Sequence, residues 1–249
     1  NKGTSSDELL SRINILNSYL ALKNAPLTGS ATNIEFHIEE ILTLFKSSGT
    51  IFQYEDREGK IFIPKKRHRL RISYYKNSAI HHFVEIAIII AIIKRFKATN
   101  LEDILMHYNK ICAFFINEFV GLAIDEEILI KNINDLKTIE IIANDNGTIK
   151  LNNSVPHDII EMLDSMLQNY FEGYYIVADT LLKSDIDNLP DDIMKRLREA
   201  GFRFYYKGKI KCFDAITHLI FKNALIFFNS IDEKEIAVNK EYLSNFLLD

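Results

Sequence analysis

The sequence predicts a mainly α-helical fold, a helical body that carries three short β-hairpins. Glycine and proline are scarce, nine and four among 249 residues, so long segments contain no helix breaker. Apolar residues recur at helical spacing behind residues that cap helix N-termini. Runs rich in β-formers are short and flank turn sequences. We therefore expect one continuous region over residues 1–249 rather than two independent domains.

Two helices are predicted first. The pair Ser5-Ser6 offers an N-cap for a helix whose apolar positions continue toward the breaker Pro26. Thr32 or Asn33 can cap a second helix, in which isoleucine, leucine and phenylalanine form one apolar stripe. This second helix is expected to end near Gly49.

A hairpin and two long helices follow. The β-rich runs 50–54 and 60–63 flank a short charged turn, which predicts two antiparallel strands. Residues 70–96 contain no glycine or proline and predict one unbroken helix. Asn100 is a suitable cap for another helix over 101–119.

The C-terminal half predicts four further helices and two hairpins. The helices are expected over 125–136, from Pro156 to about Leu182, from Pro190 onward, and over 214–221. Asn146-Gly147 is a strong turn signal between strands at 138–142 and 148–151. A third hairpin would pair 223–228 with 235–238.

Composition excludes several classes of protein. The 30 basic and 34 acidic residues give a net charge of −4, which argues against a general nucleic-acid-binding surface. Cys112 and Cys212 fit no metal-binding or disulfide pattern, so the compartment is predicted to be reducing. No nucleotide-binding fingerprint is present either, and we expect no metal and no cofactor. The strongest apolar window, 79–93, is too short to span a membrane.

The order "helix, then hairpin" recurs, and it is the layout of winged-helix modules, which bind nucleic acids or proteins. The predicted helices at 34–45 and 125–136 are rich in glutamate and aspartate, and phosphate would be repelled by them. We therefore favour small packing modules inside a helical body and keep the winged-helix module as the alternative. No nucleic-acid partner is expected.

Motifs for catalysis are missing. None of the seven histidines is followed by aspartate five residues later, so the His-x-x-x-x-Asp arrangement of a general base and its orienting carboxylate is absent. His81 and Glu85 have i, i+4 spacing and could share a helix face. An intrahelical hydrogen bond between them is the preferred interpretation, and half of a metal site is the alternative. No catalytic residue is predicted.

A dense basic run is the strongest local anomaly. Five cations fall in seven residues: Lys65, Lys66, Arg67, Arg69 and Arg71. Polar aromatic residues and an apolar segment follow, an order that suits contact with an anionic membrane surface. We assign Lys65, Lys66 and Arg67 to this contact. Composition alone favours the other interpretation, a solvated basic loop in front of a core helix.

A helix that begins near residue 70 would gather hydrogen-bond donors on neighbouring faces. The candidates for binding substrate or another anion are Arg69, Arg71, Tyr74, Tyr75, Lys76, Asn77 and His81. The cations can pair with phosphate, and the hydroxyl and amide groups can donate further hydrogen bonds. In the alternative interpretation the tyrosines belong to the core, and both interpretations remain open.

Several segments resemble one known family. Arg71–Phe83, with its Tyr-Tyr-Lys-Asn sequence, resembles a segment downstream of the catalytic domain in membrane-bound glycerol-3-phosphate acyltransferases. Lys76 stands where many members have arginine. Met166–Val177 is similar to a Phe-x-Glu-x-Tyr helix farther along in that family. Ser6–Leu22 and Cys112–Phe119 resemble two helices of the same region, in matching order.

The resemblance implies a C-terminal region whose catalytic domain lies upstream, related to dihydroxyacetone-phosphate acyltransferase. The family moves an acyl group from acyl-CoA or acyl carrier protein to the 1-hydroxyl of glycerol 3-phosphate, at the cytoplasmic face of a membrane. Its Glu-Gly-x-Arg block is missing here, since Glu58-Gly59-Lys60-Ile61 lacks the arginine. The implied partners are that catalytic domain, both substrates through the full enzyme, and an anionic membrane surface. The chain alone is expected to be inactive.

Overall fold

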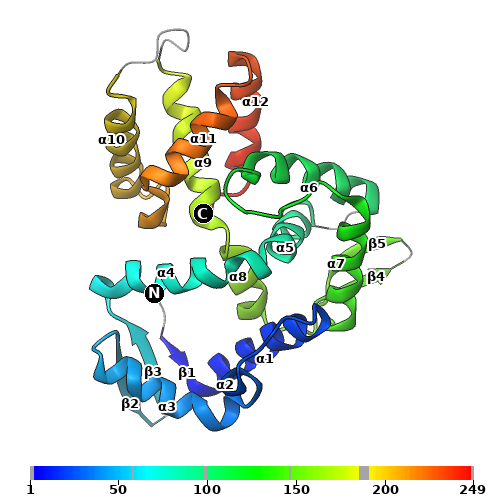
Figure 1. The fold of residues 1–249 in the computed structure, drawn as a ribbon, viewed down its shortest axis with the longest axis vertical. Coiled ribbons are helices and arrows are strands. Elements are labelled where there is room, and N and C mark those ends of the chain that lie inside the picture. The colour runs from blue at the N-terminus through cyan, green and yellow to red at the C-terminus, as the bar shows by residue number, and fades with distance from the viewer. Residues whose placement is uncertain (1–2, 58, 98–99, 146, 185–190, 248–249) are drawn as a thin grey trace. The chain divides into compact units, whose positions relative to one another are not determined.

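The computed structural model describes residues 3–57, 59–97, 100–145, 147–184 and 191–247. Within these ranges the chain is mainly helical with a few short antiparallel strands, as predicted (Figure 1). It forms two compact units. The first unit comprises Asn1–His82 with Asp135–Ile139, and the second comprises Phe83–Asn134 with Glu140–Asp249. That residues 1–249 act as one functional region stays a prediction.

The first unit contains a small three-stranded sheet, three helices between its first and second strands, and one helix after its last strand. Its elements are β1 (Thr4–Ser5), α1 (Ser6–Leu22), α2 (Gly29–Thr32), α3 (Ile34–Ser47), β2 (Ile51–Asp56), β3 (Gly59–Pro64), a 3₁₀ turn (Lys66–His68), α4 (Arg69–Ala79) and a second 3₁₀ turn (Ile80–His82). The sheet is antiparallel in the order β1-β3-β2. The predicted first hairpin is therefore confirmed, and β1 adds a strand to it.

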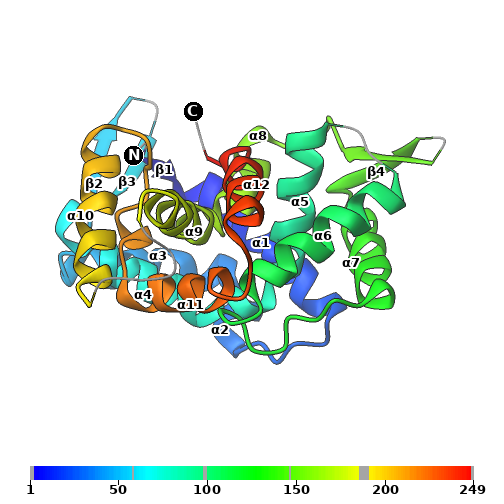
Figure 2. The same cartoon turned by 90° about the horizontal axis from the view of Figure 1, so that it is seen from above.

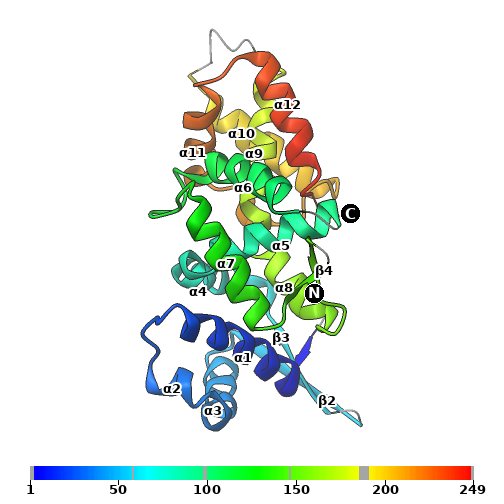
Figure 3. The same ribbon diagram turned by 90° about the vertical axis from the view of Figure 1, so that its right-hand side faces the viewer.

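Local sequence explains where α1 and α3 form. Ser5 caps α1 through a capping box, in which its Oγ accepts from the Glu8 amide at 3.2 Å and its own amide donates to Glu8 Oε2 at 2.8 Å. Ile34, Ile38 and Leu42 recur on one face of α3 and are buried. They pack with β2 and β3 into a core beneath the sheet, with α1 alongside (Figure 3).

The second unit contains one helix, α9 (Gln168–Leu181), on which three other helices pack. Its elements are α5 (Val84–Phe96), α6 (Leu101–Phe115), β4 (Ile142–Asp145), β5 (Thr148–Leu151), α8 (His157–Ser165), α9 (Gln168–Leu181), α10 (Ile193–Tyr206), a 3₁₀ turn (Phe213–Ala215), α11 (His218–Phe228) and α12 (Glu233–Ser244). Helix α7 (Glu126–Thr138) contributes residues to both units. Helices α10, α11 and α12 pack around α9 (Figure 2). Nearly every residue of α9 is buried, as expected of a helix enclosed on all sides.

The predicted third hairpin is wrong. Asn223–Phe228 belongs to α11, and Glu235–Val238 lies within α12. Asp232 caps α12, with its Oδ1 accepting from the Glu235 amide at 2.9 Å. Phe228 and Ile236, two of the residues that suggested strands, are instead buried in helices that pack on α9, and this tertiary packing overrides their β-propensity.

Two predicted long helices are interrupted. The segment 70–96 is divided by the 3₁₀ turn Ile80–His82, and the segment 156–182 is divided between α8 and α9. The second hairpin is confirmed, with Gly147 in the left-handed region at φ 87°. Its first strand starts later than predicted, because α7 extends to Thr138 and the chain then reverses at Glu140, which has φ 59°. Pro190 lies outside the described residues.

The two cysteines lie in different surroundings. Cys112 is buried in α6, and this burial raises the pKa of its thiol to about 12. Cys212 is half-buried in the loop before the last 3₁₀ turn. Neither of these two described cysteines forms a disulfide.

Candidate functional site

Helix α4 and the 3₁₀ turn before it contain nearly all residues that the sequence proposed for anion binding. The backbone over Arg69–Ala79 is helical, so the predicted helix forms there. The side chains of Lys66, Arg69, Arg71 and Tyr75 lie outside what the structure describes. Their assignment to an anion site therefore stays a prediction.

The described side chains of α4 face mainly outward. Tyr74 is 70% exposed, so this tyrosine is not a core residue. Asn77 is exposed as well, and Lys76 is half-buried. Ser78 Oγ donates to the Tyr74 carbonyl oxygen at 3.0 Å, which occupies that hydroxyl within the helix. This surface can be reached by a ligand from solvent.

The sequence suggested that His81 and Asn77 lie on one helix, but the structure places them in different elements. Helix α4 ends at Ala79, and the His81 ring lies against the His82 ring with 3.9 Å between centroids. Partial burial and the charge of His81 lower the pKa of His82. The predicted His81–Glu85 pairing on one helix is also wrong, because Glu85 belongs to α5 and accepts a hydrogen bond from Asn132 Nδ2 at 2.8 Å.

Two of the predicted membrane-contact cations converge at the end of α3. A Cβ placed on Gly49 would lie 3.7 Å from Arg67 Nη2 and 3.8 Å from Lys65 Nζ. Gly49 has φ 69° and reverses the chain just after α3 ends. Cations near a helix C-terminus interact favourably with the helix dipole. Lys65 and Arg67 therefore stabilise this corner of the fold and also concentrate positive charge there.

The second unit holds buried charges that are already paired. The Asp164 carboxylate accepts from Lys94 Nζ at 2.6 Å and from Arg95 Nη1 at 2.7 Å, and its side chain is 1% exposed. Lys183 and Lys240 both bind Asp179 across α9 and α12. Burial acts to raise the pKa of Asp179, but the two lysines outweigh it and the pKa is lowered. These ion pairs link neighbouring helices of the second unit.

Glu172 holds a loop against α9. Its carboxylate oxygens accept from the backbone amides of Lys211 and Cys212 at 2.9 and 2.8 Å, and Gln168 Nε2 donates to it at 3.0 Å. Burial raises the pKa of Glu172, and these hydrogen bonds oppose the increase. The glutamate of the Met166–Val177 segment, which is similar to the family's Phe-x-Glu-x-Tyr helix, thus has a structural role in this chain.

A second glutamate, Glu118, follows α6 and is half-buried. Burial raises the pKa of Glu118 to about 7, and the neighbouring Asn223 and Tyr174 only partly offset this. Aromatic rings surround it, with Phe119 and Tyr170 4.8 Å apart between centroids. The Cys112–Phe119 and Met166–Val177 segments therefore pack against each other. Among the described residues, no group of three metal-binding side chains is present.

A comparison of the chain with known protein families gives a match that covers most of its length. The model of the glycerol-3-phosphate acyltransferase C-terminal region matches residues 1–232 of the chain. The chain belongs to this family. This membership confirms the resemblance drawn from the Tyr-Tyr-Lys-Asn and Phe-x-Glu-x-Tyr segments. Both segments lie inside the matched residues, the first in α4 and the second in α9.

For this acyltransferase C-terminal region, a membrane-spanning role finds no support in the described helices. None of them combines the length and the apolar character that crossing a bilayer requires.

A nucleic-acid role is disfavoured by α3. The first unit does place helices before a two-stranded hairpin, in the order expected of a winged-helix module. The helix in front of the hairpin exposes Glu35, Glu39 and Glu40, which would repel a phosphate backbone. This acidic face argues against nucleic-acid binding through α3.

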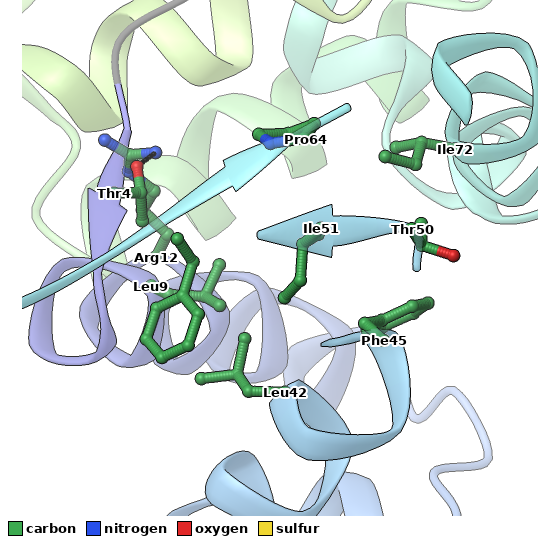
Figure 4. Close-up of a pocket in the computed structure, with 10 residues that line it drawn as sticks. Thr4, Leu9, Arg12, Leu42, Phe45, Thr50, Ile51, Pro64 and Ile72 are labelled. Atoms are coloured by element: carbon green, nitrogen blue, oxygen red, sulfur yellow. Dashed lines mark hydrogen bonds between the residues drawn. The ribbon is translucent and has the colours of Figure 1, made fainter. Parts of the chain in front are cut away.

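Arg12 was not among the candidates predicted from the sequence, and the structure places it beside a cavity in the first unit (Figure 4). A signal was present, because Arg12 interrupts the apolar positions Leu9, Ile13 and Leu16 of α1. A cation at such a position often covers the core with its aliphatic stem, so the signal alone points to no ligand.

Proposed function

We propose that this chain is the C-terminal region of a membrane-associated glycerol-3-phosphate 1-O-acyltransferase. It supports acyl transfer from acyl-CoA or acyl carrier protein to glycerol 3-phosphate in phospholipid synthesis. The observation that carries the proposal is the family match over residues 1–232. The missing His-x-x-x-x-Asp arrangement supports a region that assists a catalytic domain and does not itself catalyse.

Within this function, α4 supplies an anion-binding surface. The exposed Tyr74 and Asn77 can donate hydrogen bonds, and the basic residues in and before the helix provide charge. The phosphate of the polyol substrate or of the acyl donor is the ligand that this chemistry suits.

The kinetic test uses the full-length enzyme. Arg71→Ala and Lys76→Ala should each lower kcat/KM for a phosphate-bearing substrate about tenfold, which corresponds to about 1.4 kcal/mol. The thermal midpoint should stay unchanged, since an anion contact on a solvated face contributes little to folding. Lys234→Ala, an exposed lysine on α12, is the control. If the two variants instead unfold at a lower temperature while kcat/KM per folded molecule is unchanged, α4 has a structural role and does not bind substrate.

Lys65, Lys66 and Arg67 are proposed to contact an anionic membrane surface. The convergence of Lys65 and Arg67 at Gly49 supports this, because charges held together act on one patch of lipid. The chain should co-sediment with vesicles of phosphatidylcholine and phosphatidylserine. It should not co-sediment with vesicles of phosphatidylcholine alone. The double variant Lys65→Gln/Arg67→Gln should weaken this binding by about 2 kcal/mol.

The matched control for vesicle binding is Lys195→Gln/Arg198→Gln, which removes two exposed cations from α10. Equal loss of binding in both double variants would mean that net charge alone attracts the chain. In that case the basic segment has no specific membrane role.

A further inference from the structure

A second basic and aromatic segment, residues 200–213, runs from the end of α10 through a loop to the last 3₁₀ turn. It contains five aromatic residues and four cations: Phe202, Phe204, Tyr205, Tyr206 and Phe213, with Arg203, Lys207, Lys209 and Lys211. No acidic residue falls within this segment, although the whole chain has a net charge of −4. The segment is therefore a local concentration of positive charge on the second unit.

Four of its aromatic rings pack together at the surface, those of Phe202, Tyr205, Tyr206 and Phe213, which we call the ring cluster. Tyr205 packs edge-on against Tyr206 and Phe213, with 5.7 and 5.5 Å between centroids. Phe202 lies against Phe213 and Tyr206, with centroids 5.9 and 6.5 Å apart. Tyr206 is 80% exposed and Phe213 is 43% exposed, so the ring cluster is open to solvent.

The loop that carries the lysines is fixed beside the ring cluster. It leaves Tyr206, reverses at Gly208 with φ 71°, and returns to Phe213. Glu172 accepts hydrogen bonds from two backbone amides of this loop at 2.9 and 2.8 Å. Because both ends of the loop belong to the ring cluster, its lysines lie along the edge of the rings.

The charge of these lysines is available to a partner. Lys207, Lys209 and Lys211 are all exposed. Lys209 Nζ lies 5.3 Å from the centroid of the Phe204 ring, a contact that leaves the charge in place. Within the part of the chain that the structure describes, none of the three belongs to an ion pair.

We infer that this surface binds an anionic lipid bilayer, with the rings of Tyr206 and Phe213 among the head groups and the lysines against anionic lipids. Tyrosine combines an apolar ring with a polar hydroxyl and is enriched at the membrane–water interface. Clustered cations beside such rings are attracted to anionic lipids.

Two other partners fit this surface less well. Lysine is depleted in protein–protein interfaces, and three of the four cations here are lysines. Nucleic-acid bases stack on open ring faces, whereas Tyr205 meets two neighbouring rings edge-on. A lipid surface requires neither a lysine-poor interface nor free ring faces.

The inference deepens the proposed membrane association and rests on it, but it uses a different surface. The ring cluster and its loop belong to the second unit, whereas Lys65, Lys66 and Arg67 belong to the first. Loss of either contact can therefore be measured separately.

The chain contains no tryptophan, so one substitution introduces a single fluorescent reporter. With vesicles of phosphatidylcholine and phosphatidylserine, the emission of Tyr206→Trp should move to shorter wavelength, and brominated acyl chains in these vesicles should quench it. Tyr54→Trp is the control, since Tyr54 is 54% exposed on β2 of the first unit, and it should show neither effect. Vesicles of phosphatidylcholine alone should leave both emissions unchanged.

The contribution of charge is tested in the Tyr206→Trp background. Lys207→Gln/Lys211→Gln should weaken vesicle binding about twentyfold, since each cation near an anionic surface contributes about fivefold. Lys222→Gln/Lys234→Gln removes two exposed lysines from α11 and α12 and should bind nearly as tightly as the parent.

Three results would overturn the inference. The first is unchanged emission of Tyr206→Trp at vesicle concentrations that sediment the chain, which would leave the contact of the basic segment intact and favour an acidic protein surface as the partner here. The second is equal loss of binding in the two lysine variants, which would reduce the effect to net charge. The third is quenching that Lys65→Gln/Arg67→Gln abolishes and Lys207→Gln/Lys211→Gln leaves unaltered.

Discussion

Asp164 shows how a single residue determines the geometry of several segments. It lies in α8, and its two partners, Lys94 and Arg95, lie at the end of α5. Arg95 Nε also donates to the Asn245 carbonyl oxygen at 2.9 Å, which ties the chain beyond α12 to the same cluster. Because the carboxylate is almost fully buried, the cluster is stable only while all its charges are compensated.

Asp164→Asn should therefore lower the free energy of unfolding by about 3 kcal/mol, because Arg95 would keep a poorly solvated charge without its partner. Urea unfolding followed by circular dichroism measures the change. Asp145→Asn is the control, since Asp145 pairs with Lys150 at the surface and its loss should not move the midpoint. A similar midpoint for both variants would contradict a structural role of the buried cluster.

Glu118 predicts a pH dependence with a definite sign. Its pKa is raised by burial from 4.5 to about 7, so the folded state favours the protonated form. The stability that this provides is fully present below pH 4.5 and is lost as the pH rises through about 7. Glu118→Gln should remove this loss, about 2 kcal/mol after allowance for partial exposure.

The measurement for Glu118 is urea unfolding across this pH range, in wild type and in Glu118→Gln. The neighbouring Tyr170 does not titrate there, because burial raises its pKa to about 12. Glu199→Gln, an exposed change on α10, should keep the wild-type slope. Parallel curves for wild type and Glu118→Gln would show that Glu118 does not titrate with folding.

At the scale of elements, local signals were sufficient wherever a cap or a turn defines the structure. Ser5 and Asn100 cap the helices that they were expected to cap, and Gly59 takes the positive φ that its hairpin requires. The interruption at Ile80–His82 could not be predicted, since no glycine or proline marks it. The prediction of a third hairpin was wrong for a different reason: α9 supplies the packing surface that stabilises α11 as a helix.

The close packing of α9 on α11 leads to an element-scale prediction. A Cβ on Gly173 would clash with the Ile220 side chain and lie 3.1 Å from the Ala215 carbonyl oxygen. Gly173→Ala should therefore destabilise the chain by about 1–2 kcal/mol, although alanine is the better helix former by about 1 kcal/mol.

Gly29→Ala is the control for this packing effect. Gly29 begins α2, and a Cβ there would have no neighbour within 4 Å. This variant should be neutral or slightly more stable in urea unfolding. If Gly173→Ala behaved in the same way, helix propensity would outweigh the close approach of α11 to α9.

The candidate site was predictable only in part, for a physical reason. Charge and aromatic patterning located the α4 segment, because those signals lie in consecutive residues. The cavity beside Arg12 combines side chains from α1, α3, both long strands and α4, which are distant in sequence. Only the folded first unit brings them together, so no local pattern could indicate it.

For the molecule as a whole, we predict that the isolated 249-residue chain has no acyltransferase activity. No histidine has the required aspartate five residues later, so no general base of that kind is available to the 1-hydroxyl of glycerol 3-phosphate. The assay combines the purified chain with glycerol 3-phosphate and a long-chain acyl-CoA. Turnover above the rate without protein would place the catalytic group within these residues.

Because Cys112 is buried and Cys212 only half-buried, a thiol-reactive label can be directed to a single site. A maleimide reacts with thiolate, so Cys112, with its pKa of about 12, should stay unmodified while Cys212 reacts. We expect one label per folded chain by mass spectrometry and two after denaturation. A fluorophore on Cys212 would sit where Glu172 holds the loop, and its anisotropy would report when that loop detaches from α9.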